Sequence, residues 1–274
     1  MRPSSRSVVA PDDLRELAVE AATVAGELLQ RFARDLAEGA DLDVVHKASA
    51  TDPVSAADAA AERAIVEALL TSLPDDGILG EEDQASREGS TGRTWVIDPL
   101  DGTVNFLYGS PLWCVSVACV DVEGTVAGAI VHPTSGEVFH GARGEGAWLG
   151  ERALRVREVD DPAHGLVCTG FAYDRAVRTD WGREAVGLLS RFRDLRRGGA
   201  AALDLAWVAA GRADAYVEFA LQPWDWAAGR LLVVEAGGVV TELERELGGA
   251  RQPGLVAGGH RLHDALLEHL GHRP

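Results

Sequence analysis

Apolar side chains recur every three or four positions in the first part of the chain. Between residues 14 and 32 this spacing defines one face of a helix, made by Leu14, Leu17, Ala21, Val24, Ala25, Leu28, Leu29 and Phe32. The helix is expected to begin near Asp12 or Asp13, either of which can cap it. After a polar stretch, a second helix is predicted over about 55–73, because Pro74 cannot continue it.

The pattern then changes to short apolar runs that are typical of strands. GILG, at 77–80, is a short strand, and the polar segment 84–94 is a loop. From Trp95 to about Ala153, runs rich in apolar and β-branched residues are separated by Gly, Pro and Ser turns. This arrangement predicts an antiparallel meander.

Strands and helices alternate after residues 155–165. Strands are predicted at LVCTGF, ADAYVEF, GVVTEL and GLVAGG, and helices near 180–193 and in AALDLAWVAAG, DWAAGRLLVVEAGG and LHDALLEHL. Such alternation favours α/β layers. We therefore expect two parts, an N-terminal α+β part over 1–155 and a C-terminal α/β part over 156–274.

The composition is that of a globular protein: 46% of the 274 residues are hydrophobic, which is enough for a sizeable core. No apolar run approaches the roughly 20 residues of a membrane span, and the N-terminal segment lacks the apolar stretch of a signal peptide. Cys114, Cys119 and Cys168 are too few for a disulfide framework and are interpreted as core residues, the first two on opposite faces of a strand. These features predict a cytoplasmic protein.

The formal net charge of −17 argues against a general affinity for nucleic acid or for an anionic membrane. A protein this acidic can bind a phosphate group where a local positive charge is present. Bound metal ions would supply such a charge.

Two aspartates close the apolar run in WVIDPLDGTVNF, residues 95–106. Pro99 interrupts the strand ladder, and Gly102 allows a tight turn directly after Asp101. Asp98 and Asp101 are therefore expected to point into one space, where each raises the pKa of the other unless a cation holds them. Carboxylate oxygens are the donors that Mg²⁺ and Mn²⁺ prefer. The alternative is that Asp98 caps a turn and that Asp101 is solvated.

Acidic residues follow two further strands. Glu81, Glu82 and Asp83 come after GILG, and Asp225 lies between a strand and a long apolar helix in QPWDWAAG. Each has an ordinary alternative, since acidic loops are common and Asp225 is a natural N-cap for its helix. The presence of acidic residues at three strand ends favours a shared metal site, because α/β sheets bind ligands beyond the carboxyl ends of their strands. Four carboxylates converging there would hold two or more divalent cations.

The motifs GEE, WVIDPLDGTVNF and PWDWAAG, in this order, resemble those of the inositol monophosphatase family of Mg²⁺-dependent, lithium-sensitive phosphatases. The resemblance extends from about residue 12 to 270, and RRGGAAALDLAWVAAGRADAYVE is similar to the bacterial members. It implies a layered α-β-α-β-α sandwich of the inositol monophosphatase and fructose-1,6-bisphosphatase type. It also implies a site between the two parts and a homodimer.

Matched by motif position, the resemblance implies metal ligands at Glu81, Asp98, the backbone carbonyl of Leu100, Asp101 and Asp225. They would hold two or three Mg²⁺ ions, for which Mn²⁺ can substitute. Catalytic roles are implied for Glu81, Asp98 and Thr103.

Contacts with the substrate are implied for Asp101, Gly102, Thr103, Ala201 and Glu218. Lys47 and Asp58 match an upstream pair near the metal site. Asp204 fits the bacterial pattern without an assigned role. Ala200 stands where many bacterial members have serine or threonine, which puts one substrate hydrogen bond in doubt.

The implied reaction is the metal-assisted hydrolysis of a small phosphate monoester. Inositol 1-phosphate is the leading substrate, and histidinol phosphate, fructose 1,6-bisphosphate and 3′-phosphoadenosine 5′-phosphate are alternatives. Glu218 discriminates poorly, because a carboxylate suits both polyol hydroxyls and an ammonium group. A hypothesis from another class is a regulatory protein that binds the transcription machinery, although the net charge disfavours direct contact with RNA.

Overall fold

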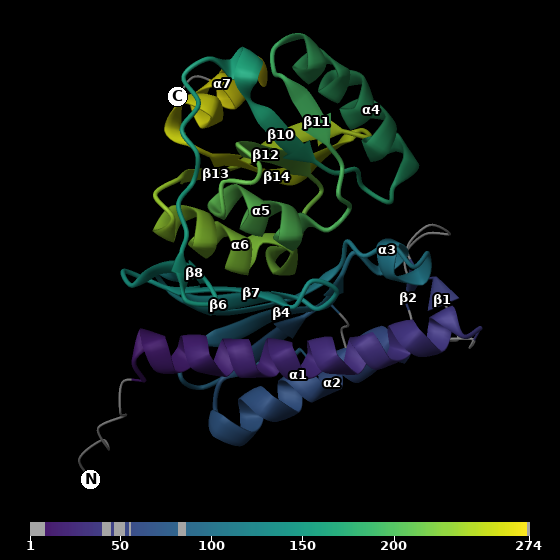
Figure 1. Cartoon of the computed structure of the whole chain (residues 1–274), viewed down its shortest axis with the longest axis vertical. Helices are drawn as coiled ribbons and strands as arrows, with labels where there is room; N and C mark the ends of the chain where they lie inside the picture. The colour runs from purple at the N-terminus through teal and green to yellow at the C-terminus, as the bar shows by residue number, and fades with distance from the viewer. Residues whose placement is uncertain (1–8, 40–44, 47–52, 55, 82–85, 273–274) are drawn as a thin grey trace.

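Helices and sheets alternate in five layers in the computed structural model (Figure 1). The structure describes residues 9–39, 45–46, 53–54, 56–81 and 86–272 of the 274. The layers are α1 (Pro11–Ala37) with α2 (Ala56–Ser72), a seven-stranded sheet, α5 (Ala201–Ala209) with α6 (Pro223–Glu235), a five-stranded sheet, and α4 (Arg175–Ala185) with α7 (His260–His269). The α-β-α-β-α sandwich implied by the family resemblance is therefore confirmed.

The first helix begins one residue before the aspartates that were expected to cap it. Its N-cap is Ala10, and Pro11 takes the first helical position, where the missing N–H of proline costs nothing. Asp12 and Asp13 lie in the first turn, where negative charge is favourable near the positive end of the helix dipole. The prediction that one of them caps the helix was wrong, whereas the second helix, predicted over 55–73, is confirmed as α2.

The seven-stranded sheet contains the predicted meander. Its strands, in spatial and chain order, are β3 (Gly77–Gly80), β4 (Thr94–Asp101), β5 (Cys114–Asp121), β6 (Gly124–His132), β7 (Glu137–Ala142), β8 (Gly146–Leu149) and β9 (Arg152–Ala153). β3 is parallel to β4, and the other neighbours are antiparallel. A short helix, α3 (Thr103–Leu107), follows β4 directly. The polar stretch before α2 contains an unpredicted antiparallel pair, β1 (Val45–His46) and β2 (Pro53–Val54).

The second sheet has the strand order β11 (Asp194–Arg196), β10 (Leu166–Thr169), β12 (Ala215–Phe219), β14 (Ala250–Gly258) and β13 (Val239–Leu247). β10 is parallel to both of its neighbours, and β14 is antiparallel to both of its own. β11 was not predicted. The helix expected near 180–193 starts earlier, because Asp174 caps α4 by accepting from the N–H groups of Ala176 and Val177. A 3₁₀ segment, Val186–Ser190, follows it, and another covers Pro162–His164.

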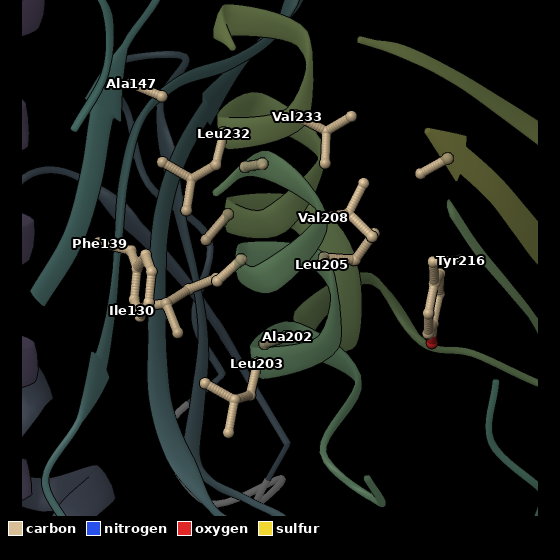
Figure 2. Close-up of a cluster of buried hydrophobic side chains, with 14 of the residues drawn as sticks. Ile130, Phe139, Ala147, Ala202, Leu203, Leu205, Val208, Tyr216, Leu232 and Val233 are labelled. Atoms are coloured by element: carbon tan, nitrogen blue, oxygen red, sulfur yellow. The ribbon is translucent and has the colours of Figure 1, made fainter. Parts of the chain in front are cut away.

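The middle helical layer joins the two sheets. Figure 2 shows Ile130 and Phe139 of the seven-stranded sheet facing Leu232 of α6, while Val208 of α5 lies toward Tyr216 of β12. Further clusters lie under α1 and α2 and under α4 and α7. Both faces of the large sheet are thus buried, which explains why its strands read as nearly continuous apolar runs.

The three cysteines are buried and free, as expected. Cys114 belongs to the cluster between the sheets and Cys119 to the cluster under α1 and α2, so the prediction that they occupy opposite faces of their strand is confirmed.

Among the described helices, none is long and apolar enough to cross a membrane.

Candidate active site

A pocket of about 700 Å³ opens where the carboxyl ends of β3 and β4 meet the N-terminal ends of α5 and α6. Four of the predicted carboxylates line it. Glu81 comes directly after β3, Asp98 and Asp101 lie at the end of β4, and Asp225 lies in the first turn of α6. The predicted convergence of these residues is therefore confirmed, and their role as metal ligands stays a prediction.

Pro99 interrupts the pairing of β4 without ending the strand. The register between β4 and β5 shifts between Asp98 and Asp101, and pairing resumes where Asp101 faces Cys114. Within the irregular stretch, the backbone N–H of Leu100 donates to Asp98 Oδ1 at 3.0 Å. The proline, which has no N–H to donate, thus creates a bulge that leaves both aspartates facing the pocket.

Asp101 is held by the start of helix α5. The N–H of Ala201 donates to its Oδ1 at 3.2 Å, and the N–H of Ala202 donates to its Oδ2 at 2.7 Å. The helix has Ala200 at its N-cap, a residue with no side chain to satisfy these donors, so a carboxylate from β4 takes the place of a cap. The Ala201 N–H is therefore engaged by Asp101. The predicted contact of Ala201 with substrate stays a prediction.

Burial raises the pKa of Asp101 to about 6, while hydrogen bonds from Ala202, Cys114 and Ala201 oppose that rise. Burial also raises the pKa of Asp98 well above its usual value, and the charges of Glu81, Asp101 and Asp225 raise it further. The repulsion inferred from the sequence thus acts on Asp98, where the charge of Asp101 ranks after desolvation and after the charge of Glu81.

The donors suit a hard divalent cation in kind, since carboxylate and carbonyl oxygens are what Mg²⁺ prefers. The carboxylates of Glu81, Asp98, Asp101 and Asp225 line one pocket, and the charges of the other three raise the pKa of Asp98. Within the described ranges, however, no three or more His, Cys, Asp or Glu side chains are already grouped tightly enough to hold a metal.

Asp225 lies in the first turn of α6 but is not its N-cap. The N-cap of α6 is Gln222, Pro223 is the first helical residue, and Asp225 is the third. Its Oδ2 accepts a hydrogen bond from the Gln222 N–H at 2.6 Å, which completes a capping box. The alternative, in which Asp225 is the N-cap, is therefore excluded, because Pro223 fixes an earlier helix start. Burial raises the pKa of Asp225.

The turn after Asp101 brings Thr103 to the pocket. Gly102 has φ +92°, a conformation that L side chains rarely adopt, and a Cβ there would lie 2.9 Å from the carbonyl oxygen of Leu112. Thr103 Oγ1 lies 3.1 Å from the Leu100 carbonyl and 3.4 Å from Asp58 Oδ2. Asp58 is fully buried beside the site, as its predicted supporting role requires.

Lys47, Glu82 and Asp83 lie outside the described residues, so their predicted places stay untested.

Glu218 of β12 lines the same pocket. Its Oε2 accepts a hydrogen bond from the Tyr216 hydroxyl at 2.7 Å, and its carboxyl group lies against Gly170, where a Cβ would collide with it. Burial raises the pKa of Glu218 to about 7. Asp204 is buried nearby but lines a second, smaller pocket of about 390 Å³.

Three residues near the site were given no role from the sequence. Cys114 contacts Asp101 Oδ2 at 3.5 Å, the carboxyl of Glu62 abuts Gly80 beside Glu81, and Arg197 lines the pocket. Arg197 stands in the RRGG stretch that precedes α5, which was noted for its family pattern only. Its place at the pocket depends on β11, a strand that the sequence did not predict.

Two histidines near the C-terminus make contacts away from the pocket. His260 contacts Glu158, and the buried His263 lies 2.8 Å from Thr241 Oγ1. No described histidine lines the acidic pocket.

Carboxylates gathered at strand ends, between the two sheets of a layered α-β-α-β-α fold, match the class of phosphatases that the sequence motifs resemble. Within that class, the chain belongs to the inositol monophosphatase family, whose model matches residues 10–273.

Named relatives agree with this membership. The chain is 44% identical over 227 residues to the Nus factor SuhB of Xylella fastidiosa strain Temecula1, covering 82% of this chain and 80% of that protein. It is 41% identical over 272 residues to the inositol-1-monophosphatase of Mycobacterium leprae, covering 94% and 93%. The crystal structure of the extragenic suppressor protein suhB from Bartonella henselae superposes with a TM-score of 0.84 at 35% identity, covering 94% and 98%.

Proposed function

We propose that this chain is a Mg²⁺-dependent phosphatase that hydrolyses small phosphate monoesters, with inositol 1-phosphate as its foremost substrate. The observation that carries the proposal is the convergence of Glu81, Asp98, Asp101 and Asp225 on one pocket. Family membership and the relative named inositol-1-monophosphatase support it.

Glu81, Asp98, Asp101, Asp225 and the Leu100 carbonyl would hold two or three Mg²⁺ ions, or Mn²⁺ in their place. Such ions lower the pKa of a bound water and stabilise the charge on a leaving oxygen. The same positive charge would let an acidic pocket accept a phosphate group.

The protein groups contribute orientation and proton transfer. Glu81 and the Thr103 hydroxyl would orient the attacking water, and the Glu81 carboxylate would take up its proton. Asp58, 3.4 Å from Thr103 Oγ1, helps to fix the rotamer of that hydroxyl. The backbone N–H groups of Gly102 and Thr103 would donate to phosphate oxygens.

Glu218 would bind the alcohol part of the substrate. Its carboxyl group is fixed by Tyr216 and lines the pocket together with the four acidic residues. An inositol ring carries vicinal hydroxyls that can donate to this carboxylate, which favours a polyol ester. Histidinol phosphate, fructose 1,6-bisphosphate and 3′-phosphoadenosine 5′-phosphate are the competing substrates.

A turnover panel at equal substrate concentration and saturating Mg²⁺ tests the proposal. We expect inositol 1-phosphate to show the highest catalytic efficiency among the four esters. Glu218→Gln should reduce that efficiency about tenfold while leaving hydrolysis of p-nitrophenyl phosphate, which has no polyol, nearly unchanged. A preference for histidinol phosphate would overturn the substrate assignment, and release of phosphate from none of these esters would overturn the activity.

A regulatory function is the second candidate, since the Xylella fastidiosa and Pseudomonas aeruginosa relatives are named Nus factor SuhB. Affinity capture from lysate with and without Mg²⁺ tests it. Recovery of transcription proteins would support a regulatory role, and their absence under both conditions would count against it.

We also propose the homodimer and the division into parts at 1–155 and 156–274, which agrees with the separation of the two sheets.

A further inference from the structure

Arg197 is the one basic side chain among the described residues that line the acidic pocket. It follows β11 and leads into α5, so the second sheet and the middle helical layer set its position. Its charge lowers the pKa of Glu218 and of Asp204, although burial raises both. The guanidinium is therefore electrostatically close to the Glu218 carboxylate, at the end of the pocket assigned above to the alcohol part of a substrate.

The backbone leaves room for this guanidinium. Gly199 adopts φ +86°, and a Cβ at this position would collide with Arg197 Nη1. Two glycines in a row, Gly198 and Gly199, thus let the chain turn into α5 while the arginine side chain lies over it.

Among the described residues, two nearby arginines, unlike Arg197, form ion pairs with carboxylates of the protein. Arg196 pairs with Asp194, and Arg212 pairs with Glu137. Both line only the smaller pocket, whereas Arg197 lines the smaller pocket and the acidic one. For Arg197, no carboxylate in the described parts of the chain lies within ion-pair distance, so its charge remains available to a ligand.

We propose that Arg197 is a specificity residue that lets the acidic pocket accept esters whose alcohol part carries a second anionic group, a carboxylate or a phosphate. This inference rests on the proposed phosphatase function. Guanidinium binds such groups through two parallel hydrogen bonds, whereas the surrounding carboxylates would repel them. The same charge disfavours an alcohol part that carries an ammonium group, although Glu218 alone would attract one.

A series of three-carbon phosphate esters isolates this effect. Glycerol 3-phosphate has an uncharged hydroxymethyl group, 3-phosphoglycerate has a carboxylate in its place, and serinol phosphate carries an ammonium group. The measurement is the catalytic efficiency, kcat/KM, toward each ester with saturating Mg²⁺, for the wild type and for Arg197→Gln. The matched control is Arg196→Gln, which removes the adjacent arginine outside the acidic pocket.

The Arg197→Gln variant should lose catalytic efficiency toward 3-phosphoglycerate by about tenfold relative to glycerol 3-phosphate, mainly through weaker substrate binding and hence a higher KM. Its efficiency toward serinol phosphate should stay level or rise. Arg196→Gln should leave the relative efficiencies toward all three esters unchanged.

An arginine that only balances the charges of Glu218 and Asp204 would change all three esters by one common factor, and that result would overturn the proposal. Wild-type protein that hydrolyses inositol 1-phosphate but discriminates against 3-phosphoglycerate as strongly as the variant does would also overturn it, while leaving the proposed function intact. Wild-type protein that hydrolyses none of these esters would overturn both.

Discussion

Asp98 combines two conditions that each disfavour a charged carboxylate. It is only 2% exposed, and its pKa is raised by burial and then by the charges of Glu81, Asp101 and Asp225. In the absence of a cation this residue destabilises the folded chain whenever it is ionised. A residue that is unfavourable for folding and central in an acidic pocket is a candidate for function.

Asp98→Asn should therefore have opposite effects on stability and on turnover. Removing the charge should stabilise the metal-free protein on the order of 1 kcal/mol, which corresponds to a Tm increase of about 2–4 °C. Losing a ligand oxygen should reduce phosphatase turnover at least about a hundredfold. Thermal unfolding in chelator and initial rates in Mg²⁺ measure the two effects. Asp75→Asn, at an exposed turn position outside the pocket, is the control and should change neither.

Glu218 gives a pH-dependent prediction for the metal-free protein. Its pKa is raised to about 7 from an ordinary value of 4.5. Between these two pH values the folded state binds a proton that the unfolded state has lost, so stability falls as pH rises through this range and is level above it. Replacing Glu218 with glutamine removes this contribution.

Glu218→Gln should thus flatten the loss of stability between pH 5 and pH 8 by about 2 kcal/mol, a value discounted for partial solvent access. Urea unfolding of the metal-free variant and wild type at several pH values measures the difference. Glu151→Gln, at an exposed position, should follow the wild type. Parallel pH profiles for Glu218→Gln and wild type would show that the carboxyl is ionised throughout the range.

Single residues of the site were predictable where their signal is local. Asp98 and Asp101 stand beside a proline and a glycine that define their geometry, so the sequence alone indicated a shared space. Arg197 carried no such signal, since its place at the pocket follows from the pairing of β11 with β10. The cap of α5 was also unpredictable, because Asp101 provides it from about a hundred positions away.

At the level of elements, the connection from β4 through Gly102 into α3 places Thr103 at the pocket. Gly102 combines a left-handed conformation with a close approach to the Leu112 carbonyl. Gly136, in the turn between β6 and β7, has φ +72° but no atom within 4 Å of where its Cβ would be. Comparing substitutions at the two glycines therefore separates the cost of backbone strain from the cost of a steric collision.

Gly102→Ala should destabilise the protein by about 2–3 kcal/mol, and Gly136→Ala by about 1 kcal/mol. The first variant should also lose turnover, because the collision shifts Thr103, whereas the second should keep wild-type turnover. Chemical unfolding together with initial rates checks both statements. Equal destabilisation by the two substitutions would mean that the turn relaxes around the new methyl group.

Long periodic elements were predictable, and short polar ones were not. Hydrophobic spacing and turn residues predict α1, α2 and the meander from β4 to β9. β11 is three residues long with the sequence Asp-Leu-Arg, which is too short for its alternation to be distinguished from a loop. Its pairing is decided by the neighbouring β10, so local pattern cannot indicate it.

For the whole molecule, layering explains why the site lies where it does. The seven-stranded sheet supplies Glu81, Asp98 and Asp101, and the middle helical layer supplies Asp225 and the N–H groups that hold Asp101. Glu218 and Arg197 come from the second sheet and the segment after it. The site is thus assembled from both halves of the chain. Pattern alone predicted two layered parts, and the order of the layers came from the family resemblance.

The net charge of the whole molecule makes divalent cations a requirement of the proposed function. A chain of net charge −17 presents a pocket lined by five or more carboxylates to a phosphate group that is itself negative. Without divalent cations the pocket should repel its substrate. Cation binding should therefore control turnover itself and not merely tune it.

Initial rates of phosphate release from inositol 1-phosphate, measured on metal-stripped protein across a Mg²⁺ titration, test this requirement most directly. Turnover should fall below roughly 1% in excess chelator and recover fully as Mg²⁺ saturates the pocket. Undiminished turnover in excess chelator would contradict it.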